Sequence, residues 1–196
     1  VPIGEWVLKE ACREAMNWPE HVRVAVNVSG EQLLDHNFAP SVVAALTQSG
    51  LSASRLELEV TESIFLRDAT LARSALEQVM ALGCKIALDD FGTGYSSLGY
   101  LRKLRFSTIK VDRSFVQGAA TGNAESLAII RAVVAMADSL DMSTTAEGAE
   151  TEKEVEMIRQ LGCRKIQGYY FGRPMSARDA LGLFRNRSFV HDQSAA

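Results

Sequence analysis

The 196-residue sequence contains few of the residues that form disulfides or bind zinc, with three cysteines and three histidines. Cys12, Cys84 and Cys163 are far apart and form no CxxC pair. They are therefore expected to be reduced core cysteines, which is typical of a cytosolic protein. The histidines lie in polar or terminal segments, so neither a disulfide scaffold nor a zinc enzyme is indicated.

Long apolar runs and a strong net charge are also absent. No run approaches the roughly 18 to 20 residues that a membrane-spanning helix needs, and no signal-peptide pattern opens the sequence. A formal net charge of −3 supplies no basic field for a nucleic-acid polymer. With 47% hydrophobic residues and no low-complexity linker, the chain can bury one sizeable core. We expect one cytoplasmic globular domain, which leaves open a membrane anchor in a longer parent protein.

Short runs rich in β-branched and aliphatic residues alternate with segments of helical spacing. The predicted strands are residues 22–29, 55–62, 85–90, 107–112, 142–148 and 164–170. The predicted helices include residues 71–82, 127–140 and 155–161. Gly50, Gly83 and Gly162 are expected to end helices in a left-handed conformation. This alternation predicts an α/β fold with a parallel sheet, open or closed.

Every predicted strand carries charged or amide residues at its C-terminal end. These residues are Asn27, Glu59 with Glu62, Asp89 with Asp90, Lys110 with Asp112, Glu147 with Glu150, and Gln167. A single polar residue of this kind would indicate only that the strand end is exposed to solvent. Six strands that deliver polar groups to one edge indicate a site, because a (β/α)₈ barrel builds its active site there.

The chemistry of this edge is that of oxygen ligands. Carboxylates and amides without sulfur or imidazole suit Mg²⁺, Mn²⁺ or Ca²⁺. The adjacent Asp89 and Asp90 can each face a different cation, and such a two-metal site can activate water and stabilise the leaving oxygen of a phosphodiester. Lys110 is the only ammonium in the set. We expect it to contact a phosphate oxygen or to hold the attacking water. The alternative is a salt bridge to one of the carboxylates.

The segment "FGTGYSS" at 91–97 resembles two phosphate-binding motifs only superficially. The sequence "DFG" lacks the glycine-rich loop and "HRD" of protein kinases, and "GTGYSS" lacks the GK[ST] ending of a Walker A loop. We interpret the segment as a mobile loop beside the metal site, with a loose connector as the alternative.

Six motifs in order resemble the EAL domain family of cyclic di-GMP phosphodiesterases, from "IGEWVLKEAC" to about Leu183. They are "VNVSGEQL", "LELEVTES", "ALDDFGTGYSSLGYL", "IKVDRSFV", "TAEGAE" and "IQGYYFGRPM". The resemblance implies a modified TIM (β/α)₈ barrel. It also implies Mg²⁺- or Mn²⁺-dependent hydrolysis of cyclic di-GMP to linear pGpG in bacterial second-messenger signalling.

The resemblance further implies a ligand set for two metals. Asn27, Glu59 and Asp89 would hold one ion, and Asp89 would bridge to a second ion that Asp90 also serves.

The remaining edge residues receive their roles from the same resemblance. Lys110 and Glu147 would position the nucleophilic water and the shell of the second metal, where Gln167 would hold a water or ligand. Glu62 would anchor the "FGTGYSS" loop. Lys110, Glu147 and Glu62 are accordingly the predicted catalytic residues. Asp112 and Gln167 are the predicted substrate-binding residues.

The sequence departs from the family pattern at one important point. The Glu-Ala-Leu motif, which precedes the helix of "IGEWVLKEAC" in the family, does not occur in the 196 residues. In the family its glutamate binds metal, and the arginine that follows contacts substrate phosphate. We therefore expect residues 1–186 to be an EAL domain without its first two strands, about six of eight, and residues 187–196 to be a flexible tail. A smaller departure is Ala149, where valine is usual.

Three functional hypotheses follow. The first is a metal-dependent cyclic di-GMP phosphodiesterase in the parent protein, with the present chain nearly inactive by itself. The second is a non-hydrolytic cyclic di-GMP receptor, and the third is an unrelated α/β enzyme with an acidic metal site. The carboxylates that are present favour the enzyme. A homodimer and an upstream sensory or GGDEF-type domain are the expected partners besides cyclic di-GMP.

Overall fold

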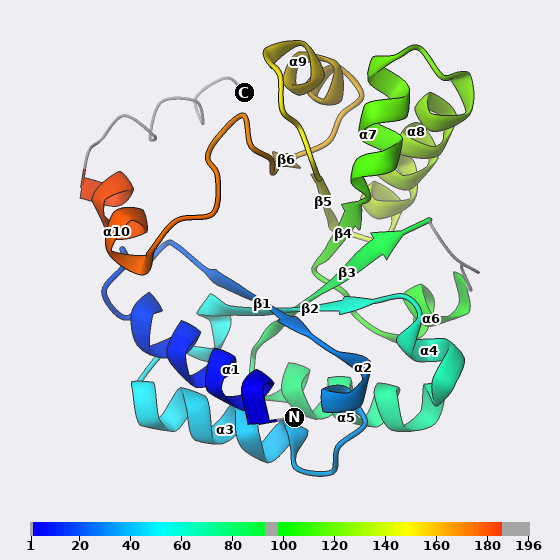
Figure 1. Ribbon diagram of the computed structural model, residues 1–196. Coiled ribbons are helices and arrows are strands. Elements are labelled where there is room, and N and C mark those ends of the chain that lie inside the picture. Colours follow the sequence, from blue (N-terminus) through cyan, green and yellow to red (C-terminus); the bar gives the residue numbers. More distant parts are fainter. Residues whose placement is uncertain (1, 93–97, 186–196) are drawn as a thin grey trace.

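The computed structural model describes residues 2–92 and 98–185 (Figure 1). Its centre is one sheet of six strands that are all parallel and follow the order of the chain. The strands are β1 (Val24–Val28), β2 (Leu56–Thr61), β3 (Lys85–Phe91), β4 (Thr108–Val111), β5 (Ser143–Ala146) and β6 (Lys165–Ile166). Sequential parallel strands with helical crossovers form a half-barrel, which confirms the predicted α/β barrel with six strands.

Helices connect the strands, and several of them cover the outer face of this half-barrel. Among the described residues they are α1 (Pro2–Ala15), α2 (Gly30–Leu33), α3 (Phe38–Ser49), the 3₁₀ turn η1 (Ala53–Arg55), α4 (Ile64–Arg67), α5 (Ala69–Ala81), α6 (Leu98–Lys103), α7 (Arg113–Ala120), α8 (Ala124–Ser139), α9 (Glu152–Gln160) and α10 (Ala177–Arg185). In Figure 1, α1, α3 and α5 lie beneath the first strands, whereas α7 and α8 lie beside β4 and β5. None of the described helices is long and apolar enough to cross a membrane.

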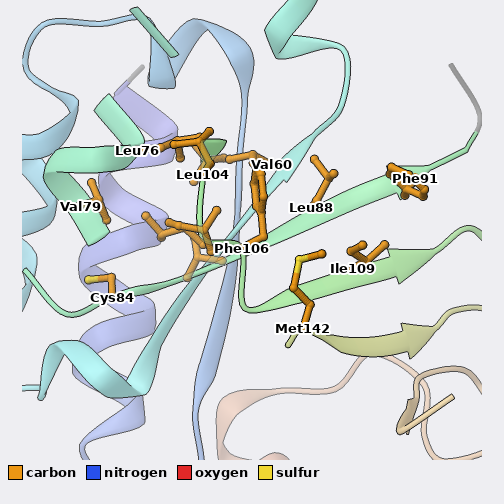
Figure 2. Packing of buried hydrophobic residues seen from close by; sticks show 14 of the residues in the cluster. Val60, Leu76, Val79, Cys84, Leu88, Phe91, Leu104, Phe106, Ile109 and Met142 are labelled. Carbon is orange, nitrogen blue, oxygen red and sulfur yellow. The ribbon is translucent and has the colours of Figure 1, made fainter. Parts of the chain in front are cut away.

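The strands alternate between an apolar face and a polar face. In β1, Val24, Val26 and Val28 are buried, whereas Ala25 and Asn27 are exposed. Successive side chains of a strand point to opposite faces, so the apolar set packs against the helices and the polar set lines the concave face. Figure 2 shows buried side chains of this core.

Two expectations about local structure are confirmed. Gly50, Gly83 and Gly162 have φ values of 78°, 98° and 91°, the left-handed conformation that ends a helix. The three cysteines are free and buried, and burial raises the pKa of each thiol to about 11. The thiols therefore remain protonated and poorly reactive at neutral pH.

The last predicted strand is shorter than expected. Residues 164–170 were predicted to be extended, but β6 ends at Ile166. Gly168 then packs so closely on the backbone of Ala149 that a Cβ there would lie 2.0 Å from the Ala149 carbonyl oxygen. Tyr170 N donates a hydrogen bond to that same oxygen at 3.1 Å. The chain therefore follows the segment after β5 instead of extending the sheet. The predicted tail at 187–196 lies outside the described residues.

Candidate metal-binding active site

Lys110 is the centre of a buried charge cluster on the concave face. It lies on β4 with 4% of its side chain exposed, and its Nζ is 2.6 Å from Glu147 Oε1. The same Nζ is 2.7 Å from Glu59 Oε2 and 3.2 Å from Asp89 Oδ2. The partners come from β2, from β3 and from the end of β5. Side chains from four consecutive segments therefore meet at the carboxyl-terminal edge of the sheet, as the sequence predicts.

The cluster holds more negative than positive charge. Burial by itself lowers the pKa of Lys110, but its hydrogen bonds with Glu147 and Glu59 outweigh this effect and the pKa is raised. Lys110 is therefore protonated at neutral pH. Burial raises the pKa of Glu59 and of Glu147, although Lys110 acts against it. One ammonium thus serves three carboxylates, so the cluster favours further positive charge.

A β-bulge brings Asp89 and Asp90 to the same site. Leu88 pairs with Ile109 and Phe91 pairs with Val111, so the two aspartates of β3 together oppose Lys110 alone on β4. Asp90 has a φ of 54°, and its N–H donates to Asp89 Oδ1 at 3.0 Å.

The physical consequence of the bulge is a shared carboxylate site. On a regular strand two consecutive side chains would face opposite sides of the sheet. Here Asp89, Asp90 and Glu147 each offer an oxygen atom, and these atoms all lie within 4.8 Å of one another. Burial raises the pKa of Asp90, and the Asp89 and Asp112 charges raise it further. An oxygen-only donor set of this kind fits Mg²⁺, Mn²⁺ or Ca²⁺.

Only some of the predicted metal ligands lie in the carboxylate group. Asp89 and Asp90 belong to the carboxylate group, but Glu59 is connected to it through Lys110. Asn27 is exposed on β1, where its Cα is in register with Glu59. Glu147, which is predicted to position water and the shell of the second metal, lies with the two aspartates.

Three other predicted residues occupy different surroundings. Glu62 is 9% exposed, and its Oε2 has no hydrogen-bond partner in the described part of the chain. Residues 93–97, which it was predicted to anchor, lie outside that part. Asp112 Oδ1 accepts a hydrogen bond from Ser114 N at 2.9 Å and thereby caps α7. Gln167 is exposed, and its N–H donates to the Ala146 carbonyl at 2.8 Å.

A second polar layer beneath the site was not predicted. Glu57 is 9% exposed and accepts hydrogen bonds from Thr108 Oγ1 at 2.7 Å and from Ser107 Oγ at 3.0 Å. The alternation in "LELEVTE" contains the signal, because Glu57 and Glu59 are two positions apart and share a face. This layer gives the carboxylate site a hydrogen-bonded floor.

The fold and this edge define the class: a TIM-barrel-like α/β domain with an acidic, divalent-metal-type site at the carboxyl ends of its strands. The family follows from comparison with known proteins. Residues 1–174 match the family model of the EAL domain. The chain therefore belongs to the EAL domain family, as its motifs indicate.

Characterised relatives support this membership. The chain is 45% identical over 185 residues to the bifunctional diguanylate cyclase/cyclic di-GMP phosphodiesterase MucR of Pseudomonas aeruginosa, covering 92% of this chain and 27% of MucR. It is 40% identical over 177 residues to the cyclic di-GMP phosphodiesterase NbdA of the same organism, covering 88% of this chain and 22% of NbdA. The chain thus spans about a quarter of the length of these relatives.

Solved structures agree with the fold. The MucR phosphodiesterase of Pseudomonas aeruginosa in complex with c-di-GMP superposes with a TM-score of 0.86 and 43% identity, over 91% of this chain and 74% of that chain. Klebsiella pneumoniae BlrP1 in a manganese/cy-diGMP complex superposes with a TM-score of 0.79 and 28% identity, over 88% of this chain and 44% of that chain.

Proposed function

We propose that this EAL domain belongs to a metal-dependent phosphodiesterase that hydrolyses cyclic di-GMP to linear pGpG. The observation that carries the proposal is the convergence of Asp89, Asp90 and Glu147 within 4.8 Å, beside the buried ammonium of Lys110. The phosphodiesterase names of MucR and NbdA and the nucleotide complexes of MucR and BlrP1 support the same substrate.

Each residue then has a task in the proposed reaction. Asp89, Asp90, Glu59 and Asn27 would hold Mg²⁺ or Mn²⁺, which supplies Lewis-acid stabilisation of charge on the phosphoryl oxygens when bound. Lys110 holds three of the surrounding carboxylates in place through its ammonium group.

The other predicted residues complete the proposed site. Glu147 orients water toward the phosphorus. The anchoring role predicted for Glu62 concerns the segment at 91–97, of which residues 93–97 lie outside the described part of the chain. Asp112 and Gln167 bind substrate from the ends of β4 and β6, where Asp112 also caps a helix. These roles rest on the resemblance to the EAL family.

A non-hydrolytic receptor is the second candidate. The specific observation in its favour is that the Glu-Ala-Leu motif does not occur in the 196 residues. The two functions differ in whether the parent protein supplies the missing metal ligand. The relatives are about four times as long as this chain, which supports further domains in the parent, such as a sensory or GGDEF-type domain. A homodimer is proposed on the resemblance alone, and reduced buried cysteines support a cytoplasmic location.

The test is metal-dependent hydrolysis by the parent protein. EDTA should abolish conversion of cyclic di-GMP to pGpG, followed by chromatography, and Mg²⁺ or Mn²⁺ should restore it because the site offers only hard oxygen ligands. Ca²⁺ should bind but support turnover poorly, since its coordination is looser. Undiminished turnover after exhaustive chelation would contradict the two-metal site. Tight nucleotide binding without turnover under any metal would favour the receptor.

A further inference from the structure

A cavity lies at the opposite end of the strands from the carboxylate site. Its volume is about 740 Å³. It is lined by the residues that begin β3, β4, β5 and β6, together with the residue before β1 and the end of α6. The cavity therefore collects segments that are far apart in the sequence at the amino-terminal edge of the sheet.

The lining of this cavity is strongly basic in a chain whose net charge is −3. Its cations are Arg23, Lys85, Lys103, Arg105, Arg164 and Lys165. Its only acidic lining residues, among those described, are Glu77 and Asp141. Glu77 is already paired with Arg73, outside the lining, at 2.7 Å. The cavity thus carries a clear excess of positive charge.

Most of these cations have no internal counter-charge. Arg164 pairs with Asp138 at 3.0 Å, and Arg23 lies 4.0 Å from Glu57. The other four form no ion pair within residues 2–92 and 98–185; they are Lys85, Lys103, Arg105 and Lys165. Each is exposed, so each can turn toward a ligand in the cavity.

The floor of the cavity is rigid. Cys84, Leu104, Phe106 and Met142 line it and belong to the buried core, where Figure 2 shows them. A well-packed floor holds the strand ends at fixed separations, and the cationic side chains extend from these fixed backbone positions. Convergent cations on a rigid frame repel one another, and an anion relieves that repulsion.

Helix ends explain part of this pattern. Several helices end just before the strands at this edge, and cations near helix C-termini are favourable. Lys103 at the end of α6 is one example. That effect accounts for single cations at separate helices, but it does not require that unpaired cations from several segments face one cavity.

We propose that this cavity binds a small anion that carries two or more phosphate groups. Its volume is within the usual range for small-molecule sites, and Lys and Arg are the side chains that bind phosphate oxygens most strongly. The proposal is independent of the proposed phosphodiesterase function, because the two sites lie at opposite ends of the strands.

The experiment is a calorimetric titration of the 196-residue chain with inorganic triphosphate. EDTA is present, so that no metal at the carboxylate site can recruit phosphate. Saturable binding that weakens with added salt is expected. The double variant Lys85→Gln/Lys165→Gln should weaken binding by about tenfold or more, since two charge-assisted contacts are lost.

The matched control is Lys9→Gln/Lys153→Gln, which removes the same charge from exposed positions on α1 and α9. The affinity of this control variant for triphosphate should stay within about twofold of that of the unsubstituted 196-residue chain. Equal weakening in both double variants would overturn the proposal, because net charge alone would then explain binding. No saturable binding up to about 1 mM triphosphate would overturn it too. If the double variant does not fold, Lys85→Gln with Lys9→Gln as control repeats the comparison.

A parallel titration with a nucleoside triphosphate identifies the source of the phosphates. Equal affinity for both ligands supports recognition of the phosphates alone. Tighter binding of the nucleotide supports a site in which the base and sugar occupy the remaining volume.

Discussion

Lys110 has three ammonium hydrogens, and three carboxylates surround it. Glu147 and Glu59 are closest, whereas Asp89 is farther away at 3.2 Å. These carboxylates compete with a water or a phosphate oxygen for the ammonium hydrogens. Asp89 is the weakest partner and also a predicted metal ligand. Asp89 would hold the metal, which would supply Lewis-acid chemistry when bound, and we expect Lys110 to act on the reacting groups beside it.

This reasoning predicts that Lys110→Met in the parent protein lowers kcat strongly and leaves nucleotide affinity within roughly tenfold. Without metal, the variant should also be less stable by about 3–5 kcal/mol, because a buried ion-pair cluster loses its cation. Steady-state kinetics and denaturant unfolding measure the two effects. Lys9→Met is the matched control, since it removes a lysine from an exposed position on α1, away from both sites. Lost binding with unchanged kcat would show that Lys110 only anchors substrate.

Asp90 should matter more for metal binding than for folding. Its φ of 54° is uncommon for a residue with a side chain, and the Asp89 charge contributes to raising its pKa. A raised pKa means that stability is lost as the pH rises from the unfolded-state pKa of this carboxyl to its folded-state pKa, and that loss persists at higher pH.

The expected result for Asp90→Asn is therefore an unchanged or higher Tm in EDTA, together with a smaller increase in Tm when Mn²⁺ is added. Asparagine tolerates the left-handed conformation, so the backbone is preserved. Thermal unfolding with and without Mn²⁺ measures both quantities. Glu20→Gln, at an exposed position before β1, controls for the loss of one negative charge. If Mn²⁺ raised the Tm of Asp90→Asn as much as that of the unsubstituted chain, Asp90 would not be a metal ligand.

At the scale of elements, the turn after β6 depends on the close approach of two backbones. A Cβ on Gly168 would lie 2.0 Å from Ala149 O and 2.4 Å from Ala149 N. Backbone atoms cannot move away cheaply, so Gly168→Ala should cost about 1–3 kcal/mol of stability and displace Gln167.

Gly182→Ala in α10 is the matched control, because a Cβ there would meet no atom within 4 Å. It should leave the stability unchanged or raise it by up to about 1 kcal/mol, since alanine favours helix more than glycine does. Denaturant unfolding of both variants gives the comparison. Equal stability of the two variants would show that the packing of Gly168 on Ala149 has no energetic weight.

At the scale of the whole molecule, β1 and β6 are the two edges of the sheet, and each pairs with one strand among the described residues. Exposed parallel edges favour association with other strands. The 196 residues also lack the Glu-Ala-Leu motif with its implied metal ligand.

We therefore expect the 196-residue chain alone to hydrolyse cyclic di-GMP at least about 10- to 100-fold more slowly than a chain extended upstream by one strand–helix–strand unit. We also expect it to associate, which light scattering can detect. The rates should be compared at equal Mn²⁺ and protein concentrations. Equal rates would show that the present residues already form the complete site.

Much of this architecture follows from local sequence. Runs rich in β-branched and aliphatic residues predict all six strands, although the last is shorter than expected. In β1 the buried Val24, Val26 and Val28 show the alternation of a half-buried strand. Glycines predict helix ends because only they adopt a positive φ without steric cost, as at Gly50 and Gly83. The motifs at the strand ends indicate both the acidic edge and the family.

Only the tertiary structure shows which distant segments lie close to one another. Local propensity does not reveal that Asp89 and Asp90 share a bulge opposite Lys110, because a bulge depends on the register of two strands. The sequence assigned Glu59 and Glu147 to separate tasks, whereas the fold joins both to one ammonium. The basic cavity likewise requires the convergence of distant strand starts. Such distances are set by how the whole sheet packs and curves, and no short stretch of sequence contains that information.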